Sequence, residues 1–140
     1  MPGPTVHFRM VMTIAVEEGL SAADAEAVAR ACLNVDQLWP GRTKPARHFI
    51  PFALYWVSRY FREAVAARAT GDSVTALTRL GWAIHSKQDS IGHGVIGLSH
   101  LRYRLGIIKR DPDDWSLMTP RARVAIERET HAMVRHFLAS

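Results

Sequence analysis

The sequence contains a single cysteine, Cys32, and this scarcity excludes two classes of protein. A disulfide within the chain needs two thiols and a zinc–thiolate cluster needs several, so one copy of the chain can build neither. Because Cys32 stands in an apolar run that includes Val28 and Ala29, we interpret it as a core residue. No segment contains the roughly 18 uncharged apolar residues of a membrane-spanning helix, so we expect no transmembrane segment.

Residues 1–19 also lack the pattern of a secretion signal. Polar or charged side chains at His7, Arg9, Glu17 and Glu18 interrupt the apolar residues, and no small-residue cleavage site follows them. We therefore expect a cytoplasmic protein.

What the sequence does have is the composition of one globular domain. Its 140 residues are enough for one hydrophobic core, and they are 48% hydrophobic and 22% charged, so we predict a single domain over residues 1–140. The net charge of +5 comes mostly from arginine, which suits anionic substrates but is equally common as surface solvation. The seven histidines are more informative, because a neutral imidazole beside apolar residues needs a partner.

Apolar residues recur at helical spacing along most of the chain. Gly71 and Asp72 form a stop followed by a cap, and Thr119 with Pro120 forms a cap and a first-turn proline ahead of the last helix. Residues 39–51 contain three prolines and a glycine and are predicted to form a loop. The pattern leaves open whether the fourth helix continues through His93, and we favour continuation. We expect an all-α fold of five or six helices, the main ones covering 6–16, 21–35, 52–70, 73–90 and 120–138.

Three potential metal ligands lie at steps of four residues on the fourth predicted helix: His85, Asp89 and His93. Each step of four rotates about 40° around a helix, so the three side chains share one broad face and can converge. Imidazole and carboxylate are usual ligands of zinc and related divalent ions, and catalytic sites use few protein ligands. The spacing therefore predicts a catalytic metal site, the alternative being a hydrogen-bonded core histidine beside a solvated aspartate.

Three further candidates precede that helix: His7, Asp36 and His48, each beside apolar residues rather than in a run of charges. Taken singly, His7 could be a surface residue, Asp36 could accept backbone donors after the second helix, and His48 could be a loop residue. Their order along the chain, together with the later helix, makes them candidate ligands.

In this order the residues resemble the zinc-dependent phospholipase C and single-strand nuclease superfamily. The match spans residues 6 to about 93, and residues 80–93 are similar to the Leu-His-x-x-Gln-Asp-Ser-x-x-His helix of small bacterial relatives. The resemblance implies one to three zinc ions, or another divalent metal, in an all-α fold. It implies a first site of Asp36, His48, His85 and Asp89, a second site of His7 with Asp89, and a third site that includes His93.

The sequence also departs from that family. The secreted phospholipases use an N-terminal tryptophan as a ligand, whereas this chain begins Met-Pro-Gly-Pro-Thr, which weakens the second site. The third site lacks the family's histidine followed four residues later by glutamate. Glu127 and His131 stand in the reversed order, and a solvent-facing ion pair or cap explains them more simply. As reserve ligands we keep His100, Asp114, Glu127 and His131.

These residues favour a metal-dependent hydrolase that acts on a phosphodiester such as a phospholipid or a nucleotide. Asp36 and Asp89 are the candidate catalytic carboxylates, with Asp36 as a potential base. The basic residues after the metal helix could hold a phosphate or form a solvated face: Arg102, Arg104, Lys109 and Arg110. The alternative is a specialised relative that uses the metal as a Lewis acid in biosynthesis, or that only binds it. A small-molecule or phosphoester substrate is expected. A nucleic-acid partner is possible but unsupported by the sequence, which also does not decide the oligomeric state.

Overall fold

The predicted all-α fold is confirmed by the computed structural model, which describes residues 5–38, 51–92, 105–107 and 115–140. Over these residues the chain forms five α-helices and no strand. The elements, in chain order, are the π-helical segment η1 (Thr5–Met10), α1 (Val11–Glu17), α2 (Ala22–Leu38), α4 (Phe52–Ala69), α5 (Ser73–Gly92), the 3₁₀ turn η2 (Trp115–Leu117) and α7 (Pro120–Ala139).

Short polar side chains begin three of the helices. Ser21, Asp72 and Thr119 each accept a hydrogen bond from the backbone N–H three residues later, at 3.1, 3.0 and 3.2 Å. Such caps satisfy N–H groups that have no partner within the helix. Gly71 adopts a positive φ of 80° at the turn between α4 and α5, where other residues would be strained. The caps predicted at Asp72 and Thr119 are therefore present.

The first helix differs from its prediction. We expected a regular helix over residues 6–16, whereas residues 5–10 are π-helical and only Val11–Glu17 form α1. A π-helical turn holds one more residue than an α-turn, and such turns occur frequently at functional sites. Apolar spacing does not reveal this widening, because positions 10 and 11 are both apolar and fit either kind of turn. The structure buries Val11 fully and leaves Met10 half-buried. The predicted continuation of α5 through His93 falls outside the described residues.

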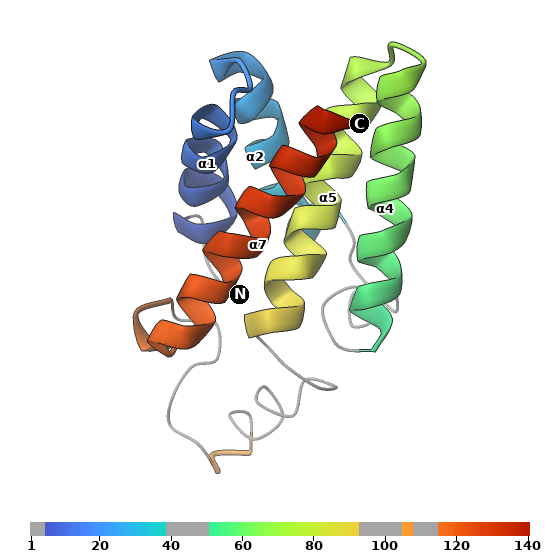
Figure 1. Cartoon of the computed structure of the whole chain (residues 1–140). Helices are drawn as coiled ribbons and strands as arrows, with labels where there is room; N and C mark the ends of the chain where they lie inside the picture. The colour runs from blue at the N-terminus through green and yellow to red at the C-terminus, as the bar shows by residue number, and fades with distance from the viewer. Residues whose placement is uncertain (1–4, 39–50, 93–104, 108–114) are drawn as a thin grey trace.

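Helix α5 is the centre of the bundle and packs against α4, α2 and α7 (Figure 1). Gly81 allows α5 to approach α2 closely. A Cβ at Gly81 would stand 2.5 Å from the Val28 carbonyl oxygen, 2.6 Å from the Ala31 Cβ and 2.8 Å from the Cys32 backbone nitrogen. This approach brings the residue one turn further along α5, His85, to the level of Cys32 on α2.

The apolar core lies between these helices. Leu80 and Ile84 of α5 are fully buried against α2 and α7 residues such as Val28 and Val134. Burial of aliphatic side chains of this size contributes about 1.5–3 kcal/mol each. No helix among the described residues has the length and apolar character needed to cross a membrane.

Candidate metal centre

Four potential ligands from three segments of the chain meet inside the bundle. His7 comes from η1, Cys32 from α2, and His85 and Asp89 from successive turns of α5. Each of these four residues is 0% exposed. Each also takes part in at least one interaction besides the contacts described below. Polar groups are costly to bury unless they are paired, so this grouping needs a specific physical reason.

The Asp89 carboxylate faces the Nε2 atoms of both imidazoles. Its Oδ2 is 3.1 Å from His85 Nε2, and its Oδ1 is 3.7 Å from His7 Nε2. The two imidazole rings stack with their centroids 4.3 Å apart. Cys32 lies on the other side of His7, with Sγ 3.7 Å from Nδ1. Two imidazoles, one carboxylate and one thiol therefore gather in one small region of the interior.

These separations fit a shared metal ion. In a tetrahedral zinc site, nitrogen and oxygen ligands at ~2.0–2.1 Å from the ion stand about 3.3–3.4 Å from each other, and sulfur stands about 3.6 Å from nitrogen. The distances of 3.1 and 3.7 Å around Asp89 bracket the first value. Ligand atoms of His7, Cys32 and His85 also all lie within 4.8 Å of one another, so this buried group could hold a metal ion.

Without a metal, the positive charge at this centre must come from protons. Burial lowers the pKa of His85, but the negative charge and hydrogen bond of Asp89, with a smaller contribution from Cys32, outweigh burial and raise that pKa well above its ordinary value. A metal ion would replace the proton, because a histidine ligand must present an unprotonated nitrogen. The Asp89 carboxylate thus attracts cations whether they are protons or metals.

The structure brings together three of the six predicted metal ligands: His7, His85 and Asp89. Asp36 belongs to α2, one helical turn after Cys32, but its side chain is outside the described part of the structure. The other predicted ligands and phosphate-binding residues also lie outside the described residues: His48, His93, His100, Asp114, Arg102, Arg104, Lys109 and Arg110.

Cys32 was missed as a candidate ligand. It is buried, as a core residue should be, but its thiol contacts His7 and approaches His85. The available signal was its position four residues before Asp36, which places both on one face of α2. A lone cysteine excludes a cluster of thiolates, but it does not exclude one sulfur among imidazoles.

The reserve ligand His131 has a different role from metal binding in the described structure. Its Nδ1 lies 2.7 Å from Glu18 and its Nε2 lies 3.7 Å from Glu17, both at the end of α1. His131 therefore forms its ion pairs with glutamates at the end of α1, and no side-chain ion pair between His131 and Glu127 is present among the described residues. Glu127 and His131 do line one shallow surface pocket of about 430 Å³ together.

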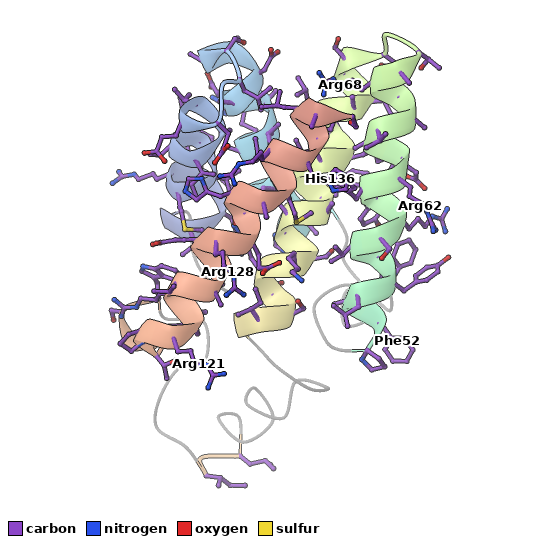
Figure 2. The ribbon with its side chains drawn as sticks, in the orientation of Figure 1. Phe52, Arg62, Arg68, Arg121, Arg128 and His136 are labelled. Carbon is purple, nitrogen blue, oxygen red and sulfur yellow. The ribbon has the colours of Figure 1, made fainter. Side chains whose placement is uncertain are left out.

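Several arginines lie on the exposed surface, separate from this centre. Figure 2 shows Arg62 on α4 and Arg121 and Arg128 on α7, all of them exposed. Arg128 forms an ion pair with Glu129 at 2.9 Å. These arginines are solvated surface residues and account for part of the net positive charge. Surface solvation was the alternative to anion binding that composition left open.

No protein-family model, curated protein or solved structure matches this chain. The class defined here is an all-α bundle with a buried His–Cys–His–Asp group. The resemblance to the phospholipase C and nuclease superfamily stays a prediction from sequence.

Proposed function

We propose that this chain is a metalloprotein whose ion is bound by His7, His85 and Asp89, and that it hydrolyses phosphodiesters. The observation that supports metal binding is the position of the Asp89 carboxylate, fully buried with both oxygens directed at histidine nitrogens. A buried carboxylate is costly unless a positive charge accompanies it. A divalent ion among these three groups supplies that charge and binds all of them.

The proposed ligand types favour zinc. Two imidazoles and one carboxylate are a recurrent zinc set, and three protein ligands leave a position for water or substrate. A site for magnesium or calcium would consist mainly of oxygen ligands. The choice of zinc therefore rests on the types of ligand and not on any one distance.

The hydrolase proposal depends on this open position. A bound divalent ion would polarise a phosphoryl oxygen and acidify a water molecule. Asp89 would balance the positive charge and hold the two imidazoles in place, which keeps the ligand geometry rigid. Asp36, one helical turn after Cys32 on α2, stays the predicted general base.

One observation favours a second function. All four side chains of the cluster are 0% exposed: His7, Cys32, His85 and Asp89. This burial suits an ion that stabilises the bundle or acts in a specialised non-hydrolytic reaction. Structural zinc sites are closed, whereas hydrolytic sites must admit water and a phosphate. The two functions share the metal centre and differ in access to it.

A phosphodiester assay separates the two functions. We expect bis(p-nitrophenyl) phosphate to be hydrolysed by the wild-type protein, activity to disappear after chelation and to return with zinc. Asp89→Asn should abolish the activity, and Asp72→Asn, which alters only a helix cap, should retain it. Zinc-loaded protein that hydrolyses neither this substrate nor phospholipid and nucleotide diesters would contradict the hydrolase and favour the second function.

A further inference from the structure

A chain of buried hydrogen bonds connects His7 to helix α7. His7 Nδ1 lies 2.9 Å from Gln88 Oε1, and Gln88 Nε2 donates to Thr130 Oγ1 at 3.0 Å. The Thr130 hydroxyl then donates to the backbone carbonyl of Ile126 at 2.8 Å. Gln88 and Thr130 are each 1% exposed, so water does not replace these bonds.

The direction of every bond in this chain follows from its last member. A carbonyl oxygen can only accept, so the single hydroxyl hydrogen of Thr130 is used on Ile126. Thr130 Oγ1 must then accept from Gln88, which directs the amide nitrogen toward Thr130 and the amide oxygen toward His7. Because an amide oxygen also only accepts, His7 Nδ1 must carry a hydrogen.

The same amide oxygen restrains Cys32. The Cys32 thiol donates to Gln88 Oε1 at 3.7 Å, a contact that would be lost in the thiolate form that binds a metal. Gln88 thus opposes a binding mode in which a metal ion is held by His7 Nδ1 and Cys32 Sγ together. The distance of 3.7 Å between Cys32 Sγ and His7 Nδ1 would by itself permit this binding mode.

We propose that Gln88 is a positioning residue that presents His7 Nε2 to the metal beside Asp89 and excludes the competing Nδ1–Cys32 mode. This inference rests on the proposed metal site. His7 Nε2 is the nitrogen that faces Asp89 Oδ1, at 3.7 Å, and it bears the lone pair once Nδ1 holds the hydrogen in the neutral ring. Groups that hold the second nitrogen of a metal-binding histidine commonly change metal affinity 10–100-fold when removed.

Thr130 allows a test that leaves every proposed ligand intact. Thr130→Val has nearly the same shape but cannot accept from Gln88, so the amide is free to rotate and direct its NH₂ at His7 Nδ1. That rotation would move the hydrogen of the neutral ring to Nε2 and block the metal-binding nitrogen. Thr130→Ser keeps the hydroxyl and is the matched control, and circular dichroism would verify that both variants fold.

Two measurements read out the effect. Nitrogen-15 NMR of the metal-free protein, with His7 assigned by its absence from His7→Asn, should show a protonated Nδ1 in the wild type and in Thr130→Ser. Zinc affinity, measured by competition with a chromophoric chelator, should fall about 10–100-fold in Thr130→Val and stay near the wild-type value in Thr130→Ser. Cobalt-loaded wild type should lack the near-ultraviolet absorption of a cobalt–thiolate bond.

Each contrary result has a separate meaning. An unprotonated Nδ1 in wild-type His7, a cobalt–thiolate band, or unchanged tautomer and affinity in Thr130→Val would overturn the role of Gln88. Because the NMR experiment needs no metal and the wild type needs no substitution, the role is tested even if Thr130→Val fails to fold. If the wild-type protein shows the expected tautomer of His7 but binds neither zinc nor cobalt, the proposed metal site is wrong, and so is the predicted change in zinc affinity.

Discussion

Two clusters in this molecule combine histidine with carboxylate, one inside the bundle and one on its surface. In the inner cluster, His85 lies 3.1 Å from Asp89 and both side chains are 0% exposed. In the outer cluster, His131 lies 2.7 Å from Glu18, and the side chain of His131 is 33% exposed. The shorter contact is thus the one that water can reach, so contact distance does not identify the functional site.

The clusters differ in the source of their positive charge. Glu18 receives two hydrogen bonds from Arg135, at 3.1 and 2.8 Å, and the permanent charge of that guanidinium is independent of pH and of metal. The positive charge that His7 and His85 offer Asp89 depends on a proton or a bound ion. The surface cluster is complete as an ion pair, whereas the inner cluster could hold a metal ion.

The largest expected effect comes from Asp89→Asn. The amide has the same size as the carboxylate but no charge, so the ion loses both a ligand and its neutralising partner. We expect zinc affinity to fall more than about 100-fold, beyond the loss typical of residues that only orient a ligand. Helical circular dichroism should be retained, and chelator competition measures the affinity.

Asp72→Asn is the matched control for that change. Asp72 caps α5 through the Thr75 backbone N–H, and asparagine caps nearly as well as aspartate, so stability should fall by at most about 1 kcal/mol and zinc binding should persist. Equal zinc binding by Asp89→Asn and the wild type would show that the inner cluster is only a hydrogen-bonded core.

The next effect concerns the approach of α5 to α2. A methyl group in Gly81→Ala would meet the Val28 carbonyl at 2.5 Å and the Ala31 Cβ at 2.6 Å, and neither atom can rotate away. We expect a loss of about 1–3 kcal/mol in urea denaturation, the usual cost of overpacking, and weaker zinc binding as His85 is displaced.

Gly92→Ala, on the same helix, isolates the role of close packing. Among the described residues, its methyl group would meet the Met118 Cε, the end of a flexible side chain that can move. This variant should unfold near the wild-type midpoint. Similar stability of the two alanine variants would contradict the account of how α5 positions the inner cluster.

The smallest effect belongs to the outer cluster and depends on pH. Hydrogen bonds from Arg135 and then His131 lower the pKa of Glu18 from 4.5 to about 2. The resulting stabilisation is complete above pH 4.5 and is lost as the pH falls toward 2, because the folded state releases this proton more readily than the unfolded state. Glu18→Gln should therefore be slightly less stable than the wild type at neutral pH and equal to it near pH 2.

High salt should reduce the neutral-pH difference, since exposed charges are screened. Glu127→Gln also removes one carboxylate, at an exposed position of α7, and is the charge-matched control, whose stability at neutral pH should stay near that of the wild type. An acid-unfolding curve of Glu18→Gln that stays below the wild type down to pH 2 would contradict the assigned role of this ion pair.

The fold was more accessible from sequence than the candidate metal centre. Apolar spacing and the caps at Asp72 and Thr119 depend on residues close together in the chain, and they predicted the helices to within a few residues. The grouping of His85 with Asp89 was also local, because both occupy one helix. The π-helical segment that carries His7 was not predicted, since its extra residue changes the turn and not the apolar pattern.

The remaining features depend on contacts between distant residues. Cys32 meets His7 and His85 only because Gly81 allows two helices to approach closely. The direction of the Gln88 amide depends on Thr130, 42 residues later in the chain. A single sequence shows which side chains could bind a metal, whereas their shared geometry comes from packing.

Anomalous scattering at the zinc edge, from crystals of protein purified without added metal, tests the central claim most directly. We predict a peak among His7 Nε2, His85 and Asp89, at the ~2.0–2.2 Å expected for zinc bonded to nitrogen and oxygen. The absence of any peak there, even after the crystals are soaked in zinc, would contradict the proposed metal centre.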